Sequence, residues 1–189
     1  MGKEDLRITK TKRALYDALV NLMKKKTFEE IKVSDICDEA LVNRSTFYAH
    51  FDDKYCLLES LINNLKQDLI DNLNSSKKFT NTKDYYIEVI DLFLNHIEEK
   101  QDTYLSIAIN NRNSILSDII YDVLDKDIVA RLNDDTYADN LDIPKDIISK
   151  FFLGAVVNVG IYWLFNINKY SKKEIIDYLV KLIPDEKRD

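Results

Sequence analysis

Apolar side chains recur at helical spacing along most of the chain, and the clearest pattern opens the segment 33–54. Four apolar residues there fall at positions i, i+3, i+4 and i+7, so they share one face of a two-turn helix. They are Val33, Ile36, Cys37 and Ala40. The period breaks at Leu41 and Val42, which predicts a turn between this helix and the next.

A second, shorter helix is predicted over residues 44–50. Asn43 is its expected N-cap, because an Asn side chain can accept hydrogen bonds from the free N–H groups of a first turn. Phe47 and Phe51 lie at i and i+4 and would anchor the helix to the core. The outward side chains are rich in donors, and none is acidic: Arg44, Ser45, Thr46, Tyr48 and His50. Such a face suits phosphate oxygens and base edges in a DNA major groove, so the pair predicts a helix-turn-helix.

The rest of the chain is also predicted to be helical. With only 3 Gly and 2 Pro in 189 residues, long uninterrupted helices are expected. Further helices are predicted at about residues 8–26, 54–73, 83–100, 103–109, 115–132, 144–167 and 171–183. The predicted fold class is therefore all-α, with about nine helices. A three-helix helix-turn-helix domain would occupy residues 1–54, and a second helical domain would occupy residues 55–189.

The charge of the chain is unevenly distributed, and this bears on the expected contact with DNA. The whole chain has a net charge of −6, yet residues 1–26 carry eight Lys or Arg against three Asp or Glu, hence +5. Lys10 and Lys12 in this segment are candidate phosphate contacts, whereas the acidic remainder would discourage nonspecific binding.

Composition also narrows the class of protein. Cys37 and Cys56 both lie at helical core positions, so reduced thiols are expected and not a disulfide. The N-terminal segment lacks the apolar core of a signal peptide, and the protein is expected to stay in the cytoplasm. No metal site or cofactor is expected. The sequence has neither a Ser/His/Asp order nor a Gly-rich phosphate loop, so an enzyme is not expected either.

The most apolar stretch is residues 151–167, and two interpretations were weighed for it. A membrane span needs about 20 apolar residues, whereas this stretch is shorter and contains Asn158. A buried helix is the favoured interpretation. Gly154, Ala155 and Gly160 within it would let another backbone approach closely.

The last two predicted helices together have more apolar surface than one core contact requires. Ser171 and Glu174 form a capping box that opens the final helix, whose apolar face is wide. Excess apolar surface on adjacent helices predicts a subunit interface. The residues proposed for it are Phe152, Ala155, Val156, Val159, Ile176, Leu179, Val180 and Ile183.

Residues 9–65 resemble the DNA-binding domain of the TetR family of bacterial transcriptional regulators. The matching positions are residues 31–36, Ala40, Thr46-Phe47-Tyr48, His50-Phe51 and Lys54. The resemblance implies that Arg44, Ser45 and Thr46 face bases or nearby phosphates. It implies that Tyr48, His50 and Lys54 mostly hold the sugar-phosphate backbone.

One position departs from the family pattern. The family usually carries Gly where this chain has Leu41, because a left-handed turn conformation is easy for Gly. A Leu that kept this conformation would cost roughly 1 kcal/mol or more. A local difference in the turn is therefore expected here.

Trp163 and the Ser-x-x-Glu start of the final helix resemble the dimerising helices of TetR-type regulators. One short recognition helix reads few bases, so a homodimer on a palindromic operator is predicted, most simply as a repressor. The resemblance further implies release by a small apolar ligand, with Tyr86, Phe93, Tyr104 and Trp163 as lining residues. The alternative keeps the fold but acts as a co-activator or through protein partners.

Overall fold

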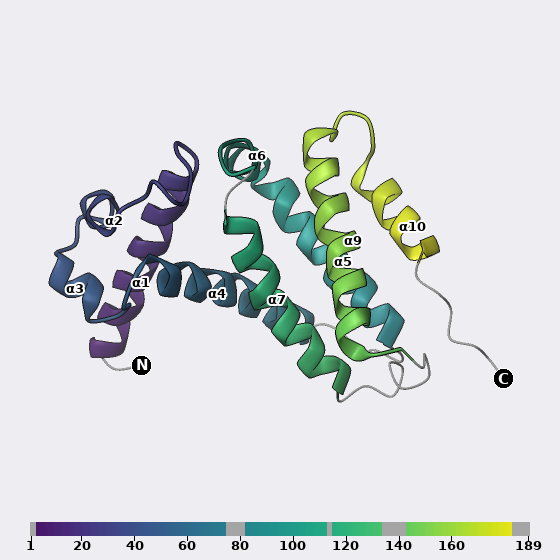
Figure 1. Ribbon diagram of the computed structural model, residues 1–189, viewed down its shortest axis with the longest axis horizontal. Coiled ribbons are helices and arrows are strands. Elements are labelled where there is room, and N and C mark those ends of the chain that lie inside the picture. The colour runs from purple at the N-terminus through teal and green to yellow at the C-terminus, as the bar shows by residue number, and fades with distance from the viewer. Residues whose placement is uncertain (1–2, 75–81, 113–114, 134–142, 183–189) are drawn as a thin grey trace. The chain divides into compact units, whose positions relative to one another are not determined.

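The computed structural model describes residues 3–74, 82–112, 115–133 and 143–182, and every regular element in these ranges is an α-helix (Figure 1). In chain order they are α1 (Lys3–Met23), α2 (Val33–Ala40), α3 (Arg44–Tyr48), α4 (Lys54–Asn74), α5 (Thr82–Glu99), α6 (Gln101–Asn110), α7 (Leu116–Asn133), α9 (Lys145–Phe165) and α10 (Lys172–Leu182). The prediction of an all-α fold is confirmed.

The chain forms two compact units, each built from two separate segments. Residues 1–65 and 102–120 make up the first, which we call the head. Residues 66–101 and 121–189 make up the second, which we call the body. The head therefore includes α6 and the first turn of α7, in addition to the predicted segment 1–54.

The head is built around a continuous apolar core. Apolar residues of α1, among them Leu15 and Leu19, are buried there, and Phe28 and Ile31 from the α1–α2 connection join them. Phe47 of α3 is fully buried in the same cluster, which also includes Leu116 of α7. Burying a Leu or Phe side chain contributes about 1.5–3 kcal/mol, so this core can hold the short helices α2 and α3 in place.

The turn after α2 keeps the left-handed conformation despite its side chain. Leu41 has φ 56° and ψ 41°, and its N–H donates to the carbonyl of Asp38 at 3.3 Å. The N–H of Val42 donates to the carbonyl of Cys37 at 3.0 Å. This pair of bonds is a Schellman motif, which satisfies two carbonyl groups at the end of the helix. The local difference expected at Leu41 is therefore absent, and Leu41 bears the strain while its side chain stays exposed.

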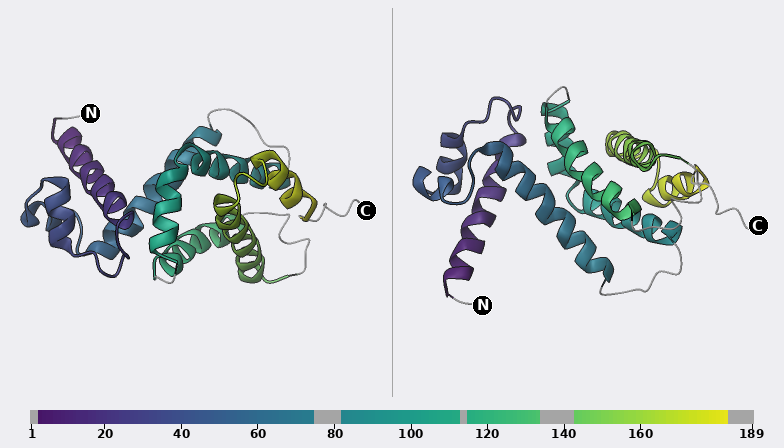
Figure 2. Two further views of the ribbon diagram at one scale, coloured as in Figure 1. Left: turned by 90° about the horizontal axis from the view of Figure 1, so that it is seen from above. Right: turned by 60° about the horizontal axis from the view of Figure 1, so that its bottom comes forward.

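The body packs α9 and α10 against α5 (Figure 2). Gly160 of α9 faces α5, and a Cβ there would be in ordinary van der Waals contact with Phe93, 3.5 Å from its Cε1. Asp125 of α7 accepts a hydrogen bond from the buried hydroxyl of Ser149 at 2.6 Å and an ion pair from Lys150 at 2.8 Å. These bonds lower the pKa of the Asp125 carboxyl and fix α7 to the first turns of α9.

Helix α9 is long and apolar enough, by length and composition alone, to cross a membrane. The core helix of a soluble protein meets the same criterion. One side of α9 is packed in the body, where Leu153, Trp163 and Leu164 are buried. The interpretation of this segment as a core helix therefore agrees with its packing.

Candidate nucleic-acid interface

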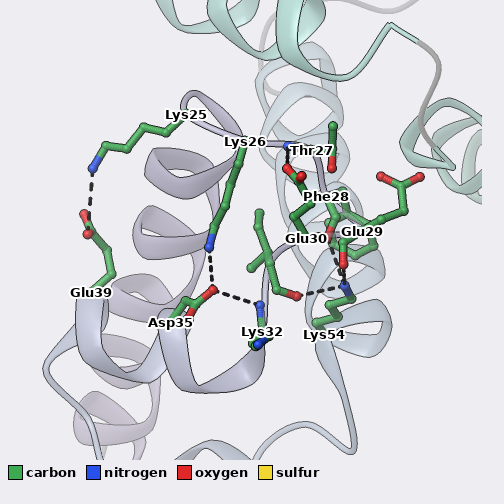
Figure 3. Close-up of polar contacts among 11 residues, drawn as sticks. Lys25, Lys26, Thr27, Phe28, Glu29, Glu30, Lys32, Asp35, Glu39 and Lys54 are labelled. Carbon is green, nitrogen blue, oxygen red and sulfur yellow. Dashed lines mark hydrogen bonds and ion pairs between the residues drawn. The ribbon is translucent and has the colours of Figure 1, made fainter.

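The start of α2 is held by a charged group on its own first turn. Asp35 accepts hydrogen bonds from the backbone N–H of Lys32 at 3.1 Å and from Nζ of Lys26 at 2.5 Å (Figure 3). The Lys26 ammonium, followed by the Lys32 amide, lowers the pKa of the Asp35 carboxyl. Because Lys26 follows α1, this pair fixes α2 against the end of α1.

Helix α3 buries one side and exposes the other, as its apolar pattern predicted. Phe47 is fully buried, and its ring centroid lies 6.0 Å from that of the buried Phe51. The residues around them fall on the outward side. Arg44, Ser45 and Tyr48 are exposed, whereas Thr46 and His50 are half-buried. The recognition face therefore presents donors and hydroxyl groups from a helix whose other side is anchored in the core.

Two details of α3 differ from the prediction. The helix ends at Tyr48, so His50 lies in the following turn. Asn43 occupies the N-cap position with an extended backbone, but its side chain makes no capping bond. Its carbonyl instead accepts from the N–H of Phe47 at 3.1 Å. Packing of Phe47 thus replaces the predicted side-chain cap in holding this short helix.

Lys54 has a different role from the predicted phosphate contact. Its Nζ donates hydrogen bonds to the backbone carbonyls of Phe28 at 2.9 Å, Glu29 at 2.9 Å and Ile31 at 2.8 Å (Figure 3). An ammonium group has three protons, so these three bonds use all of its donors. Burial lowers the pKa of the Lys54 ammonium. Lys54 is a positioning residue that ties the α1–α2 connection to α4.

Asp53 caps the start of α4 with its side chain. Its Oδ1 accepts from the N–H groups of Tyr55 and Cys56, each at 2.8 Å.

Of the two predicted N-terminal cations, Lys10 is exposed and Lys12 is half-buried. Lys12 places its Nζ 5.7 Å from the centre of the Phe51 ring, so it lies close to the chain that leaves the recognition helix.

A second clamp on the α1–α2 connection was not predicted from the sequence. The buried Asn111 accepts from the N–H of Phe28 at 2.8 Å and donates to the carbonyl of Met23 at 3.1 Å. Its neighbour Asn110 donates to the carbonyl of Lys24 at 2.9 Å. These side chains bond to backbone groups more than 80 residues away in sequence. Only the pair of Asn residues after an amphipathic helix could have drawn attention to them.

Two models of protein families match this sequence. The model described as bacterial regulatory proteins of the tetR family matches residues 15–61, which include α2 and α3. The model described as a transcriptional regulator C-terminal region matches residues 84–185, more than half of the chain. The chain belongs to the TetR family of transcriptional regulators.

Individual relatives support the family assignment over different lengths. The HTH-type transcriptional regulator YxbF of Bacillus subtilis (strain 168) is 33% identical over 70 residues, which are 36% of this chain and 18% of YxbF. The chain therefore matches less than a fifth of that relative's length. A TetR transcriptional regulator from Streptococcus agalactiae 2603V has 26% identity and a TM-score of 0.65, covering 96% of this chain and 98% of that one.

FadR from Bacillus subtilis, solved in complex with stearoyl-CoA, has the same fold. The identity is 17% and the TM-score 0.58, with 90% of this chain and 96% of FadR covered. As members of this family are transcription factors, the TetR regulator described here is not an enzyme.

The four predicted ligand-lining residues of this TetR regulator do not form one described cluster. Phe93 lies on α5 against Gly160, within the body. Trp163 is fully buried, and its Nε1 donates to the carbonyl of Tyr170 at 2.9 Å, so its role in lining a ligand site stays a prediction. Tyr104 belongs to the head, where burial raises the pKa of its hydroxyl to about 12. The side chain of Tyr86 lies outside the described residues.

The predicted dimer residues of the TetR regulator differ in their burial. Leu179 is buried in its own chain, and Phe152 packs against the cluster of Leu132 and Ile148. Both contact the core of the body, and their role in a dimer interface stays a prediction. Ala155, Val156, Val159, Ile176 and Val180 are half-buried, and Ile183 lies outside the described residues.

A different set of side chains on α9 and α10 is exposed. These are Ile147, Phe151, Ile161, Tyr162, Phe165, Tyr178 and Leu182. On α9 the exposed positions 147, 151, 158, 161 and 165 and the half-buried position 154 repeat with steps of four and three, and they form one stripe. We call them the α9 stripe. Gly154 lies in it, and a Cβ there would meet nothing within 4 Å.

Proposed function

We propose that this TetR family regulator binds double-stranded DNA as a homodimer on a palindromic operator and represses transcription by blocking the promoter. The observation that carries the DNA contact is the outward face of α3. There the exposed Arg44, Ser45 and Tyr48 stand on a helix anchored by the fully buried Phe47.

The outward residues are assigned by their chemistry. Arg44 can donate two hydrogen bonds to guanine, and Ser45 and Thr46 can contact bases or phosphates. Tyr48 and His50 suit the sugar-phosphate backbone, as do Lys10 and Lys12 from α1. Lys54 supports the same surface indirectly, through the α1–α2 connection.

Dimerisation supports this assignment on two grounds. A recognition helix of five residues reads few bases, so two copies are needed for a specific site. The α9 stripe and the exposed residues of α10 offer the apolar surface that an isologous contact between copies requires. Such a dimer would act on DNA in the cytoplasm.

We further propose that a small apolar ligand releases the repressor. This proposal is motivated by the fold shared with Bacillus subtilis FadR, which was solved with stearoyl-CoA. Phe93 is the described body residue best suited to line such a site, because it is half-buried on α5. A thermal-shift screen with acyl-CoA esters and free fatty acids tests it. A rise in melting temperature should accompany loss of DNA binding, and no shift with any of these compounds contradicts it.

The DNA contact can be tested by fluorescence anisotropy with the DNA immediately upstream of the protein's own gene, at two salt concentrations and with scrambled competitor. Specific binding should exceed competitor binding by roughly a thousandfold or more and weaken steeply with salt. Equal affinity for both sequences would contradict sequence-specific binding at that site. Preserved regulation in cells by a variant with Thr46 and Tyr48 replaced by Ala would favour action through a protein partner.

Two kinds of variant separate base contacts from phosphate contacts. Arg44→Ala should lower affinity for the operator by about 1–3 kcal/mol and relax its specificity. Lys10→Ala and Lys12→Ala should weaken all DNA sequences alike and reduce the salt slope by about 1 each. Lys173→Ala is the matched control, because Lys173 is an exposed lysine of the body. An equal loss of DNA affinity in Lys173→Ala would show that the effect of Lys10→Ala and Lys12→Ala comes from net charge alone.

A further inference from the structure

A polar pair stands in the middle of the α9 stripe. Asn158 is exposed, and its Nδ2 donates to the hydroxyl oxygen of Tyr121 at 3.0 Å. The same Nδ2 donates to the carbonyl of Gly154 at 2.7 Å. From Phe151 to Phe165 the sequence contains no charged residue, and Asn158 is its only side chain with an amide. A polar group at such a place is unexpected if the surface served only to bury apolar area.

The geometry fixes the orientation of both groups. A backbone carbonyl only accepts hydrogen bonds, so the Asn158 atom near Gly154 must be the nitrogen. That nitrogen also faces Tyr121, whose oxygen therefore acts as the acceptor. Within the described residues, the bonds of the pair leave the hydroxyl proton of Tyr121 as a donor and Oδ1 of Asn158 as an acceptor.

One donor and one acceptor make the pair complementary to itself. In a two-fold interface, residue i of one copy meets residue j of the other, and j meets i in return. Position 158 lies near the middle of the stripe that runs from 147 to 165, where a two-fold axis would cross it. Covering the stripe would also bury both groups, and a buried donor or acceptor needs a partner.

We infer that, in the homodimer, Tyr121 of each copy donates its hydroxyl proton to Oδ1 of Asn158 in the other copy. This inference rests on the proposed homodimer and names the residues that set its register. Gly154, four residues before Asn158, leaves open space for the approaching helix. The reciprocal pair of bonds would select a second copy of this chain over other apolar surfaces, since those would leave the polar groups unsatisfied.

Mixing two variants tests the reciprocal bonds. Asn158→Ala removes the acceptor in both halves of its homodimer, and Tyr121→Phe removes the donor in both halves of its own. Each homodimer should dissociate at about tenfold or higher concentration than the wild type. A heterodimer of the two variants keeps one complete bond between copies. Its other position loses donor and acceptor together, which leaves no group unsatisfied.

The heterodimer should therefore exceed its statistical share of one half. A tenfold preference gives a share of about nine-tenths, measured by native mass spectrometry after exchange between tagged and untagged chains. A mixture of tagged and untagged wild type must give one half, as must tagged and untagged Asn158→Ala. Circular dichroism should show near wild-type helix content for both variants, because Asn158 is exposed and Tyr121 half-buried.

The outcomes separate this inference from the proposed dimer. A share of one half for the two variants would overturn the bond between copies and restrict the pair to a role within one chain. A wild type that stays monomeric at all concentrations would overturn the homodimer itself. Enrichment of the heterodimer supports both, since the bond between Asn158 and Tyr121 within each chain is broken in both variants.

Discussion

The head and the body treat their apolar residues differently. In the head, the large side chains of α1, α2 and α3 converge on one core, and Leu15, Phe28 and Phe47 are fully buried. In the body, α9 and α10 leave large apolar side chains in contact with solvent, with Phe151 63% exposed and Leu182 73% exposed. The apolar side chains of the head are buried within one chain, whereas the body has apolar surface that a second chain can cover.

The difference follows from the composition of the helices. Helix α2 has apolar residues at helical spacing and charged residues between them, so it has one side for the core and one for solvent. Helix α9 is apolar on all sides over residues 151–165, apart from Asn158. A helix of that kind is suited to burial on more than one side.

The strongest test of this comparison is Phe151→Glu. A charged group on the stripe of both copies should weaken dimerisation by about 4 kcal/mol, if each Phe anchor contributes about 2 kcal/mol. Sedimentation velocity should show a monomer at micromolar concentration, with helix content preserved. If the Phe151→Glu variant dimerises as strongly as the wild type, the exposed apolar surface of the body has another use.

Phe47→Ala provides the contrasting variant in the head. Truncating this fully buried ring should lower the free energy of unfolding by about 3–5 kcal/mol, measured by urea denaturation. Dimerisation should remain close to that of the wild type, because Phe47 belongs to the head core.

The next largest loss of unfolding free energy is expected when the clamp made by Asn111 in the head is removed. Asn111→Leu removes the acceptor of the buried Phe28 N–H and the donor to the Met23 carbonyl. Leaving two buried backbone groups without partners should cost roughly 3 kcal/mol of unfolding free energy. Operator affinity should fall with it, as the α1–α2 connection loosens. Urea denaturation and anisotropy measure the two effects.

The matched control is Asn110→Ala. Asn110 is half-buried and bonds one carbonyl of the connection, that of Lys24. Its loss should cost less than about 1.5 kcal/mol. Equal costs for the two Asn residues would contradict the role assigned to burial of Asn111.

Sequence periodicity predicted the elements that have one apolar side. The stripe of α2 and the pair Phe47 and Phe51 gave the helix-turn-helix and its outward face correctly. Helix α9 has no polar side, so periodicity could not indicate which of its sides faces solvent. It predicted an interface that includes the half-buried Phe152, next to the exposed Phe151, and this stays a prediction.

Contacts between side chains and distant backbone groups left no periodic signal. Lys54 has the position and the charge of a phosphate ligand, yet three carbonyls of the α1–α2 connection use its donors. Asn111 reaches Phe28 across 83 positions of sequence. Both roles depend on tertiary packing, which local patterns do not encode.

A smaller, opposite effect is expected at Leu41. Leu41→Gly should raise the free energy of unfolding by about 1 kcal/mol, because Gly adopts the left-handed conformation without the strain of a side chain. Its 92% exposed side chain contributes little packing in return. Leu41→Ala is the control, as it keeps a Cβ and should leave most of the strain. A destabilised Leu41→Gly variant would reveal a contact made by this side chain.

The smallest effect concerns His96 in the body. Burial lowers the pKa of its imidazole, with Lys100 acting in the same direction and Glu99 and Asp68 opposing it. The unfolded chain then takes up a proton near pH 6.5 that the folded chain resists. Stability from this group is present above that pH and lost as the pH falls below it. The wild type should therefore lose more unfolding free energy between pH 7 and 5 than His96→Gln. Parallel curves for the two proteins would contradict it.

The discontinuous head has a consequence for synthesis of the protein. Its core includes Leu116, and its clamp includes Asn111, so residues 1–65 cannot complete their packing until residues 102–120 have left the ribosome. At roughly 5–20 residues per second, the missing segment follows residue 65 by about 3–11 s. During that interval the apolar sides of α1, α2 and α3 have an incomplete core, which is the kind of surface that chaperones bind. The DNA-reading part is encoded first in the gene, yet it cannot finish folding until its last segment, residues 102–120, has been made.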